Sequence, residues 1–165
     1  MLVSLRVFNA KKNFKNKRLA IVGAADSVFE EKNGDIIDSY DIVIRINKAA
    51  VTWEREESVY LGTKFTYLFH SFYENNYSGG GKIDFKKFKK IGIEKLVNPN
   101  YTLAGLKTHL NFYKRHLKLK RTYILAPSIT KSIEREMDGV IPTVGFSALM
   151  AALLSDCEEI YITGF

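Results

Sequence analysis

Three short segments of this sequence combine small residues with hydrogen-bonding groups in a way that suits an anionic or hydroxyl-bearing ligand. Gly23 ends a β-branched run and leaves room for a ligand to approach the backbone, and the turn after it can present free backbone N–H groups to an anion at a helix start. Asn47 follows a second such run, and its amide can both donate to and accept from a ribose or a base. Thr143 is a good helix N-cap, and Gly145 leaves room for a ligand against the first helical turn. Together they outline a candidate ligand site.

Each segment also has a purely structural interpretation. The turn after Gly23 lacks the Gly-x-Gly-x-x-Gly fingerprint of dinucleotide sites, and Asp26 would repel a phosphate but suits the start of a helix. Ser27 and Glu30 have the spacing of a capping box. Asn47 is as typical of a turn as of a ligand contact, and the threonine of the third segment could be simply a cap.

The other reactive side chains form no familiar catalytic arrangement. His70 and Ser71 follow a third apolar run, at the possible ligand edge, although a structural role is the simpler interpretation of the histidine. His109 and His116 fall on an expected helix, where we expect them to be half exposed. Neither metal-ligand spacing nor a Ser-His-Asp or Cys-His order is present, so no metal is expected. The glycine-rich loop 75–82 lacks the spacing of a phosphate loop and is expected to be a surface loop.

The elements that must position these residues alternate between strands and helices. The expected strands are apolar runs rather than alternating patterns, at residues 18–23, 41–46, 65–69, 95–97, 122–126 and 160–163. Helices are expected at residues 27–33, 84–91, 103–117, 129–137 and from 144 onward. This order predicts an α/β fold, a Rossmann-like, doubly wound, mainly parallel sheet with helices on both faces. In such sheets ligands bind beyond the carboxyl ends of the strands.

The composition is that of one globular domain. At 165 residues, 46% hydrophobic and 13% aromatic, the chain has enough apolar bulk for a core. The net charge of +7 fits a phosphorylated small molecule, a nucleic acid or an acidic surface as partner, although many lysines belong to expected outer helix faces. The single cysteine, Cys157, excludes an internal disulfide, and neither a membrane segment nor a secretory signal is evident. We therefore expect a soluble, cytoplasmic protein.

Two groups of these segments resemble the sialylmotifs of glycosyltransferase family 29, the sialyltransferases. That family's large motif has a strand ending in VVGN, a D-S-Y/H-D-x-V-x-R-x-N-x-A-P core and a later V-G-x-K/R-T. The corresponding segments here are LAIVGAADS, IDSYDIVIRINKAAV and YLGTKFTYLF. The small motif, P-S/T-T-G-x-x-A-L-x-x-x-C-D-E-x-x-x-x-G-F, corresponds to PTVGFSALMAALLSDCEEIYITGF. The bacterial sialyltransferases of family 42 are a more distant likeness, and the resemblance covers residues 18–165.

The resemblance implies a sialyltransferase-type domain that binds CMP-sialic acid and transfers the sugar to an acceptor glycan hydroxyl by inverting displacement, without a cofactor or metal. It divides the chain into an N-terminal extension, residues 1–17, and a nucleotide-sugar-binding domain, residues 18–165, with the C-terminal part of the family's fold missing. The implied partners are the nucleotide-sugar donor and a glycan acceptor, and no nucleic acid. By position, the implied nucleotide-binding residues are Gly23, Ala24, Ser27, Asn47, Thr143, Val144 and Gly145.

Departures from the family pattern keep other functions open. Ala24 replaces the asparagine that follows Val-Val-Gly, which removes a side-chain donor to the nucleotide. Leu19 stands where animal enzymes have the disulfide partner of Cys157, which fits a cytoplasmic enzyme. The family's catalytic histidine lies in motifs beyond Phe165, so no catalytic residue is assigned here. The alternatives are a non-catalytic or degenerate nucleotide-binding domain and, supported by the net charge alone, a basic nucleic-acid-binding module.

Overall fold

The computed structural model describes residues 4–75, 79–100, 102–116 and 120–165. Within these residues the chain forms a seven-stranded parallel sheet with the order β1-β6-β5-β4-β3-β2-β7. The strands are β1 (Leu5–Phe8), β2 (Arg18–Val22), β3 (Ile42–Ile46), β4 (Tyr67–Phe69), β5 (Lys95–Asn98), β6 (Thr122–Leu125) and β7 (Glu159–Thr163). All six strands predicted from the sequence are present, and β1 is added to them.

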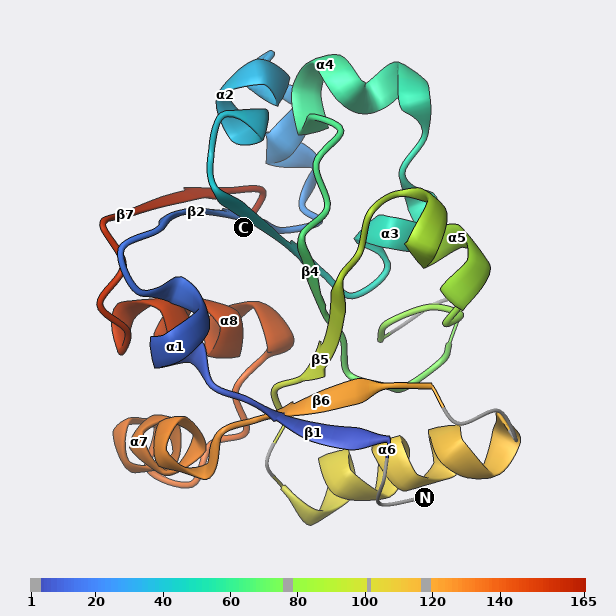
Figure 1. Ribbon diagram of the computed structural model, residues 1–165, viewed down its shortest axis with the longest axis vertical. Coiled ribbons are helices and arrows are strands. Elements are labelled where there is room, and N and C mark those ends of the chain that lie inside the picture. Colours follow the sequence, from blue (N-terminus) through green and yellow to red (C-terminus); the bar gives the residue numbers. More distant parts are fainter. Residues whose placement is uncertain (1–3, 76–78, 101, 117–119) are drawn as a thin grey trace.

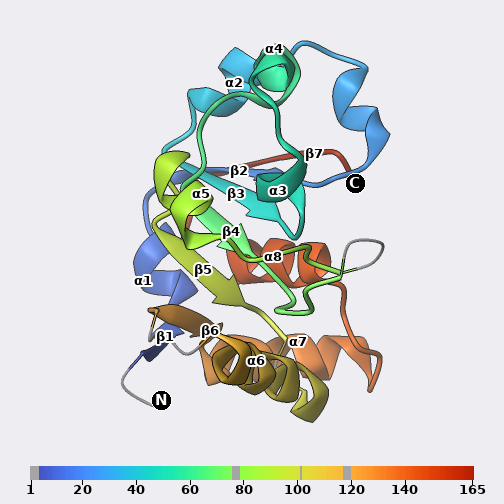
Figure 2. The same ribbon diagram turned by 90° about the vertical axis from the view of Figure 1, so that its right-hand side faces the viewer.

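Helices cover both faces of this sheet (Figures 1 and 2). One face carries α1 (Ala10–Phe14), α7 (Pro127–Met137) and α8 (Val144–Leu153), and α8 contacts β2, β3 and β4. The other face carries α2 (Gly34–Asp38), α3 (Ala49–Thr52), α4 (Ser58–Leu61), α5 (Phe85–Lys90) and α6 (Leu103–Arg115), with the 3₁₀ turns η1 (Asp26–Phe29) and η2 (Arg55–Glu57). In Figure 1, α1 and α8 lie to the left of the central strands β4 and β5, and α3 and α5 to the right. The predicted doubly wound α/β fold is confirmed.

The strand β2 illustrates why its sequence is apolar throughout. Leu19 and Ile21 point into the core shared with α1 and α8, whereas Ala20 and Val22 point into the core shared with η1 and α2. Side chains alternate between the two faces of a strand, so a sheet covered on both faces buries every position. β-branched and aliphatic runs therefore mark the central strands of this fold.

The residues before Arg18, which the sequence interpretation treats as an extension, are part of the sheet. β1 pairs in parallel with β6, and the side chain of Phe8 is buried. The Phe8 ring lies 5.5 Å from the Phe14 ring on α1 and 5.7 Å from the Phe69 ring on β4. Edge-to-face aromatic pairs of this kind add to the free energy gained from burial. The structure thus corrects the boundary at residue 17, because residues 5–14 contribute to the core.

The segment after β2 also differs from its prediction. The helix expected at residues 27–33 is replaced by η1, which has Ala25 at its N-cap and no side-chain cap, so the Ser27–Glu30 capping box does not form. A separate helix, α2, begins at Gly34, where an added Cβ would lie 2.1 Å from the Ser58 carbonyl oxygen. The close α2–α4 approach therefore requires glycine at this position. No helix in the described ranges combines the length and apolar character needed to cross a membrane.

Candidate functional site

The candidate site lies at the carboxyl ends of β2, β3 and β4, which are neighbours in the sheet. Gly23, Asn47 and Ser71 come just after these three strands, so parallel pairing brings them to one edge. A cavity of about 250 Å³ opens there between the turn after β2 and helix α3. We call it the edge pocket, and its lining includes Gly23, Ala24, Asp26, Arg45, Lys48 and Glu57.

The two glycines of the expected ligand site are both packed against the end of the chain. An added Cβ at Gly23 would lie 2.0 Å from the Gly164 carbonyl oxygen and 3.1 Å from Cδ2 of Phe165. An added Cβ at Gly145 would lie 2.7 Å from Cε1 of the same Phe165 ring. The space that we expected these glycines to leave for a ligand is thus filled by residues 164 and 165. The Phe165 side chain is itself exposed among the described residues.

Asn47 offers a free hydrogen-bond donor at this edge. It has a φ of 50°, in the left-handed region that asparagine tolerates, and its N–H donates to the Phe69 carbonyl (2.7 Å). Its Oδ1 accepts from the Ser71 N–H (3.1 Å), whereas its Nδ2 makes no hydrogen bond within the described residues. Since no buried side-chain polar atom there lacks a partner, Nδ2 reaches solvent. Asn47 can therefore donate to a ligand without losing its contact with Ser71.

Arg45 is a buried cation in the wall of the edge pocket. Its guanidinium donates to the carbonyl oxygens of Leu61 (2.6 Å) and Lys64 (2.9 Å) and lies 4.5 Å from the centroid of the Phe65 ring. Its side-chain hydrogen-bond partners within the described residues are carbonyl oxygens rather than a carboxylate. Burial lowers the pKa of Arg45 to about 10, so the side chain stays charged at neutral pH. The pocket therefore has a fixed positive charge.

Lys48 is a second cation in the pocket, and the sequence interpretation did not single it out. It is half buried directly after Asn47, and its ammonium makes no hydrogen bond or ion pair within the described part of the chain. The argument from strand ends that selected Asn47 applies equally to the next residue and could have found it. Asp26 and Glu57 also line the pocket, so its charge is mixed.

The remaining predicted residues lie in different surroundings. Thr143 caps α8, because its Oγ1 accepts from the Phe146 N–H (3.1 Å), and the predicted N-cap is confirmed. Val144 packs against the core on the α8 face. Ala24 is exposed and lines the edge pocket, whereas Ser27 is exposed on η1 and is not among the lining residues.

The histidines are more deeply engaged than expected. His70 is fully buried, its Nε2–H donates to the Gly80 carbonyl (2.8 Å) and its Nδ1 accepts from the Phe72 N–H (2.8 Å), so its ring has no nitrogen left for a ligand. His109 is buried rather than half exposed, and its ring stacks on Phe72 at 3.9 Å. His116 is half buried, as expected. In the described residues, no group of three or more His, Cys, Asp or Glu side chains is placed to hold a metal ion.

Buried His70 and His109 predict a loss of stability in mild acid. Burial lowers the pKa of each to about 4, from 6.5, and protonated Nδ1 of His109 would oppose the Asn98 amide that donates to it. The unfolded chain binds these protons first as the pH falls below 6.5. We therefore expect the free energy of unfolding to fall by about 2 kcal/mol per histidine between pH 7 and pH 5. Urea unfolding across this range measures it.

The His109→Gln variant is the matched test of that prediction, because glutamine does not titrate and can keep a hydrogen bond to Thr122. Between pH 7 and pH 5, its free energy of unfolding should fall by about 2 kcal/mol less than that of the wild-type protein, which is the contribution of one histidine. Equal pH dependence of the two proteins would contradict the proposed burial of a neutral His109.

Comparison with known proteins completes the description of the site. The family model of glycosyltransferase family 29 (sialyltransferase) matches residues 3–165. Two crystal structures of a mammalian sialyltransferase, one in complex with Gal-beta-1-3GalNAc-ortho-nitrophenol, share the fold with a TM-score of 0.65 and 19% identity over 97% of this chain. The chain spans 59% and 60% of the lengths of those two chains. No curated protein matches it.

Proposed function

This chain belongs to glycosyltransferase family 29, the sialyltransferases, and we propose that its edge pocket binds the nucleotide of CMP-sialic acid for transfer of the sugar to a glycan hydroxyl. One observation carries the proposal above the others. The free Nδ2 of Asn47 lies at the carboxyl edge of the sheet, directly before the cationic Lys48 of the pocket. An amide donor beside a lysine suits a ribose or base attached to a phosphate.

The two cations and the size of the edge pocket support the same assignment, although Asp26 and Glu57 also line it. CMP-sialic acid carries a phosphate and a carboxylate, with which Arg45 and Lys48 can pair. The volume of about 250 Å³ is below the range of about 300–1,000 Å³ typical of ligand pockets, so it suits part of the donor. We propose that the nucleotide enters the pocket and that the exposed Phe165 ring packs against the donor outside it.

The proposed chemistry is direct displacement at the anomeric carbon. The acceptor oxygen forms a bond to that carbon while the bond to the CMP phosphate breaks, with inversion, and a base must take the acceptor proton. His70 and His109 have their ring nitrogens engaged inside the protein, so we assign neither as that base. The role proposed for Asn47 and Lys48 is to orient the donor and to stabilise the charge of the leaving phosphate. Following the family resemblance, no metal ion is assigned a role.

Asn47→Asp is predicted to weaken CMP binding without unfolding the site. Aspartate tolerates the left-handed φ and can still accept from the Ser71 N–H, but it replaces the donor Nδ2 with a charged acceptor. Losing a neutral hydrogen bond typically costs about 0.5–1.5 kcal/mol, which corresponds to roughly 2–10-fold in affinity, and repulsion between the new carboxylate and the donor phosphate adds to this loss. The measurements are CMP affinity by calorimetry and the CMP-dependent rise in melting temperature.

The control is Asn9→Asp, which changes the same functional group at the N-cap of α1, where aspartate caps equally well. CMP at ten times its dissociation constant should raise the melting temperature of the wild-type protein and of this control by about 4 °C. The proposal is wrong if millimolar CMP shifts neither melting temperature nor NMR signals near Asn47.

One feature of the edge pocket favours a second candidate, a non-catalytic nucleotide-binding domain. Ala24 and Asp26 both line the pocket, and Asp26 adds a negative charge where the donor phosphate would bind. A degenerate site of this kind would bind CMP but release no CMP from CMP-sialic acid with any acceptor. Turnover by the protein in its full-length form would exclude this candidate.

A further inference from the structure

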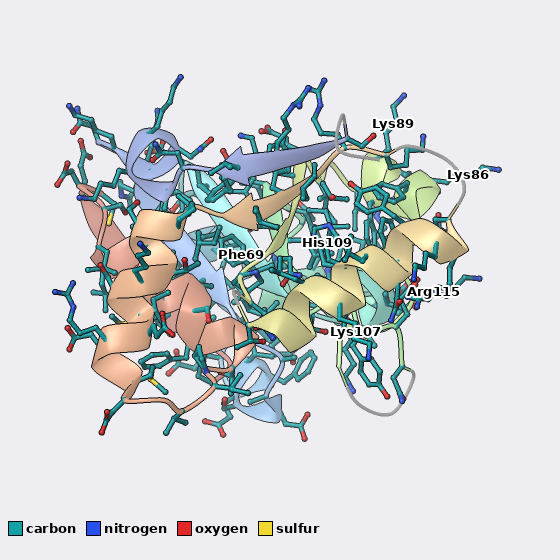
Figure 3. All side chains as sticks on the ribbon, turned by 90° about the horizontal axis from the view of Figure 1, so that it is seen from below. Phe69, Lys86, Lys89, Lys107, His109 and Arg115 are labelled. Carbon is teal, nitrogen blue, oxygen red and sulfur yellow. The ribbon has the colours of Figure 1, made fainter. Side chains whose placement is uncertain are left out.

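A second cavity in the described part of the chain lies away from the edge pocket, between α5 and the end of α6. Its volume is about 640 Å³, which is within the range typical of small-molecule sites. We call it the basic pocket because six basic side chains line it: Lys82, Lys86, Lys89, Arg115, His116 and Lys120. Figure 3 shows Lys86 and Lys89 on α5 and Arg115 on α6 at the same end of the molecule, with Lys107 farther along α6.

The positive charge of this pocket is only partly compensated within the protein. Glu74 pairs with Arg115 at the end of α6 (2.6 Å) and contacts the His116 ring that follows it (3.1 Å), which accounts for the charge of Arg115. Asp84 also lines the pocket, but its Oδ1 accepts from the backbone N–H groups of Lys86 and Lys87 as the N-cap of α5.

Four lysines therefore remain without a direct partner. The ammonium groups of Lys82, Lys86, Lys89 and Lys120 make no hydrogen bond or ion pair in the described ranges. Their side chains are exposed at the cavity, so the cost of holding like charges together falls when an anion enters. A phosphate monoester carries a charge of about −1.5 to −2 at pH 7 and suits such a cluster better than a single carboxylate does.

The apolar part of the lining indicates what the phosphate is attached to. Ile83 and Phe85 belong to the same cavity, and the Phe85 ring is half buried. Lys120 Nζ lies 6.0 Å from the centroid of that ring. An aromatic face beside lysines offers an apolar surface for a sugar ring and cations for its phosphate.

We propose that the basic pocket binds a phosphorylated saccharide through Lys82, Lys86, Lys89 and Lys120. This site is separate from the edge pocket, but the two are linked by packing, because an added Cβ at Gly81 would lie 3.2 Å from Lys48 Cβ. Lys87 Nζ on α5 also donates to the Val51 carbonyl on α3. Other residues of α3 line the edge pocket. The saccharide's role as acceptor would depend on the proposed transferase function. Its binding to the basic pocket does not depend on that function.

The experiment compares glucose 6-phosphate, glucose and inorganic phosphate as probes of the whole chain, by calorimetry and by NMR signals of Phe85. Glucose 6-phosphate should bind more tightly than inorganic phosphate by at least threefold, and glucose should not bind. The Lys86→Gln/Lys89→Gln variant should lose at least fivefold in affinity, because it removes two of the four unpaired charges. Lys11→Gln/Lys12→Gln, which removes two exposed charges on α1, should stay within twofold of the wild-type protein.

Other outcomes would overturn the proposal. These are an absence of binding, equal affinity for phosphate and glucose 6-phosphate, or an equal loss in both double variants. Binding to vesicles of phosphatidylcholine and phosphatidylglycerol without binding to glucose 6-phosphate would assign the pocket to a membrane surface instead. CMP binding is measured in parallel: Lys86→Gln/Lys89→Gln should retain it, so failure here and failure of the edge-pocket proposal are distinguishable.

Discussion

Replacing Arg45 with alanine is expected to lower the free energy of unfolding by about 3 kcal/mol. The substitution leaves the carbonyls of Leu61 and Lys64 without their donors and opens a cavity beside Phe65. A buried group left without its partner costs about 1–3 kcal/mol, and the cavity adds to this. The substitution also removes a buried cation, whose desolvation is unfavourable and lowers its pKa. Removing this desolvation cost offsets part of the loss in stability. Urea unfolding at pH 7 measures the difference.

Two further variants separate the causes of this loss. Arg45→Met fills much of the cavity but donates no hydrogen bonds, so it should recover about 1 kcal/mol of the lost stability. Arg135→Ala removes an exposed arginine from α7 and should change stability by less than about 0.5 kcal/mol. If Arg45→Ala were as stable as Arg135→Ala, the hydrogen bonds of Arg45 to residues 61 and 64 would not contribute to the fold. The same variant should also weaken CMP binding, since Arg45 lines the edge pocket.

The central strands could be predicted because a strand that is buried on both faces is apolar at nearly every position. Each predicted strand is present, with ends within two residues of those observed. β1 escaped prediction because it has only four residues, of which Arg6 and Val7 are exposed and Phe8 alone is deeply buried. Helices α2, α3 and α4 have four or five residues each, so an apolar period of 3.6 residues cannot be recognised in them. Their positions depend on packing, as in the glycine-dependent contact between α2 and α4.

The position of the candidate site at one edge of the sheet could be predicted from the sequence, but the packing of its residues could not. The strand order places Gly23, Asn47 and Ser71 together, and this follows from residues that come just after buried strands. Which atoms remain free depends on contacts between distant segments. His109 is buried because Phe72, from another segment, stacks on its ring, and no local pattern indicates that. The use of both His70 nitrogens by residues 72 and 80 is equally invisible in the sequence.

Gly23→Ala is expected to lower the free energy of unfolding by about 3 kcal/mol and to abolish CMP binding. An added Cβ would lie 2.0 Å from the Gly164 carbonyl oxygen, a backbone atom that cannot rotate away. The ends of β2 and β7 must then separate, which strains the bonds from Gly23 N–H to the Thr163 carbonyl (2.9 Å) and from Ala25 N–H to the Gly164 carbonyl (3.0 Å). Overpacking typically costs about 1–3 kcal/mol, and the upper end applies where the backbone itself must move. Unfolding and CMP titration measure the two effects.

Gly139→Ala separates steric overlap from backbone strain, because Gly139 has a φ of 83° but no atom within 4 Å of an added Cβ. It should cost about 1–2 kcal/mol through strain alone and leave CMP binding intact. Gly23 was expected to leave room for a ligand, and on that interpretation alanine at this position would impair binding without destabilising the free protein. The packed arrangement of residues 23, 164 and 165 predicts both effects together. A Gly23→Ala protein with wild-type stability and weakened CMP binding would therefore restore the ligand-contact role for this glycine.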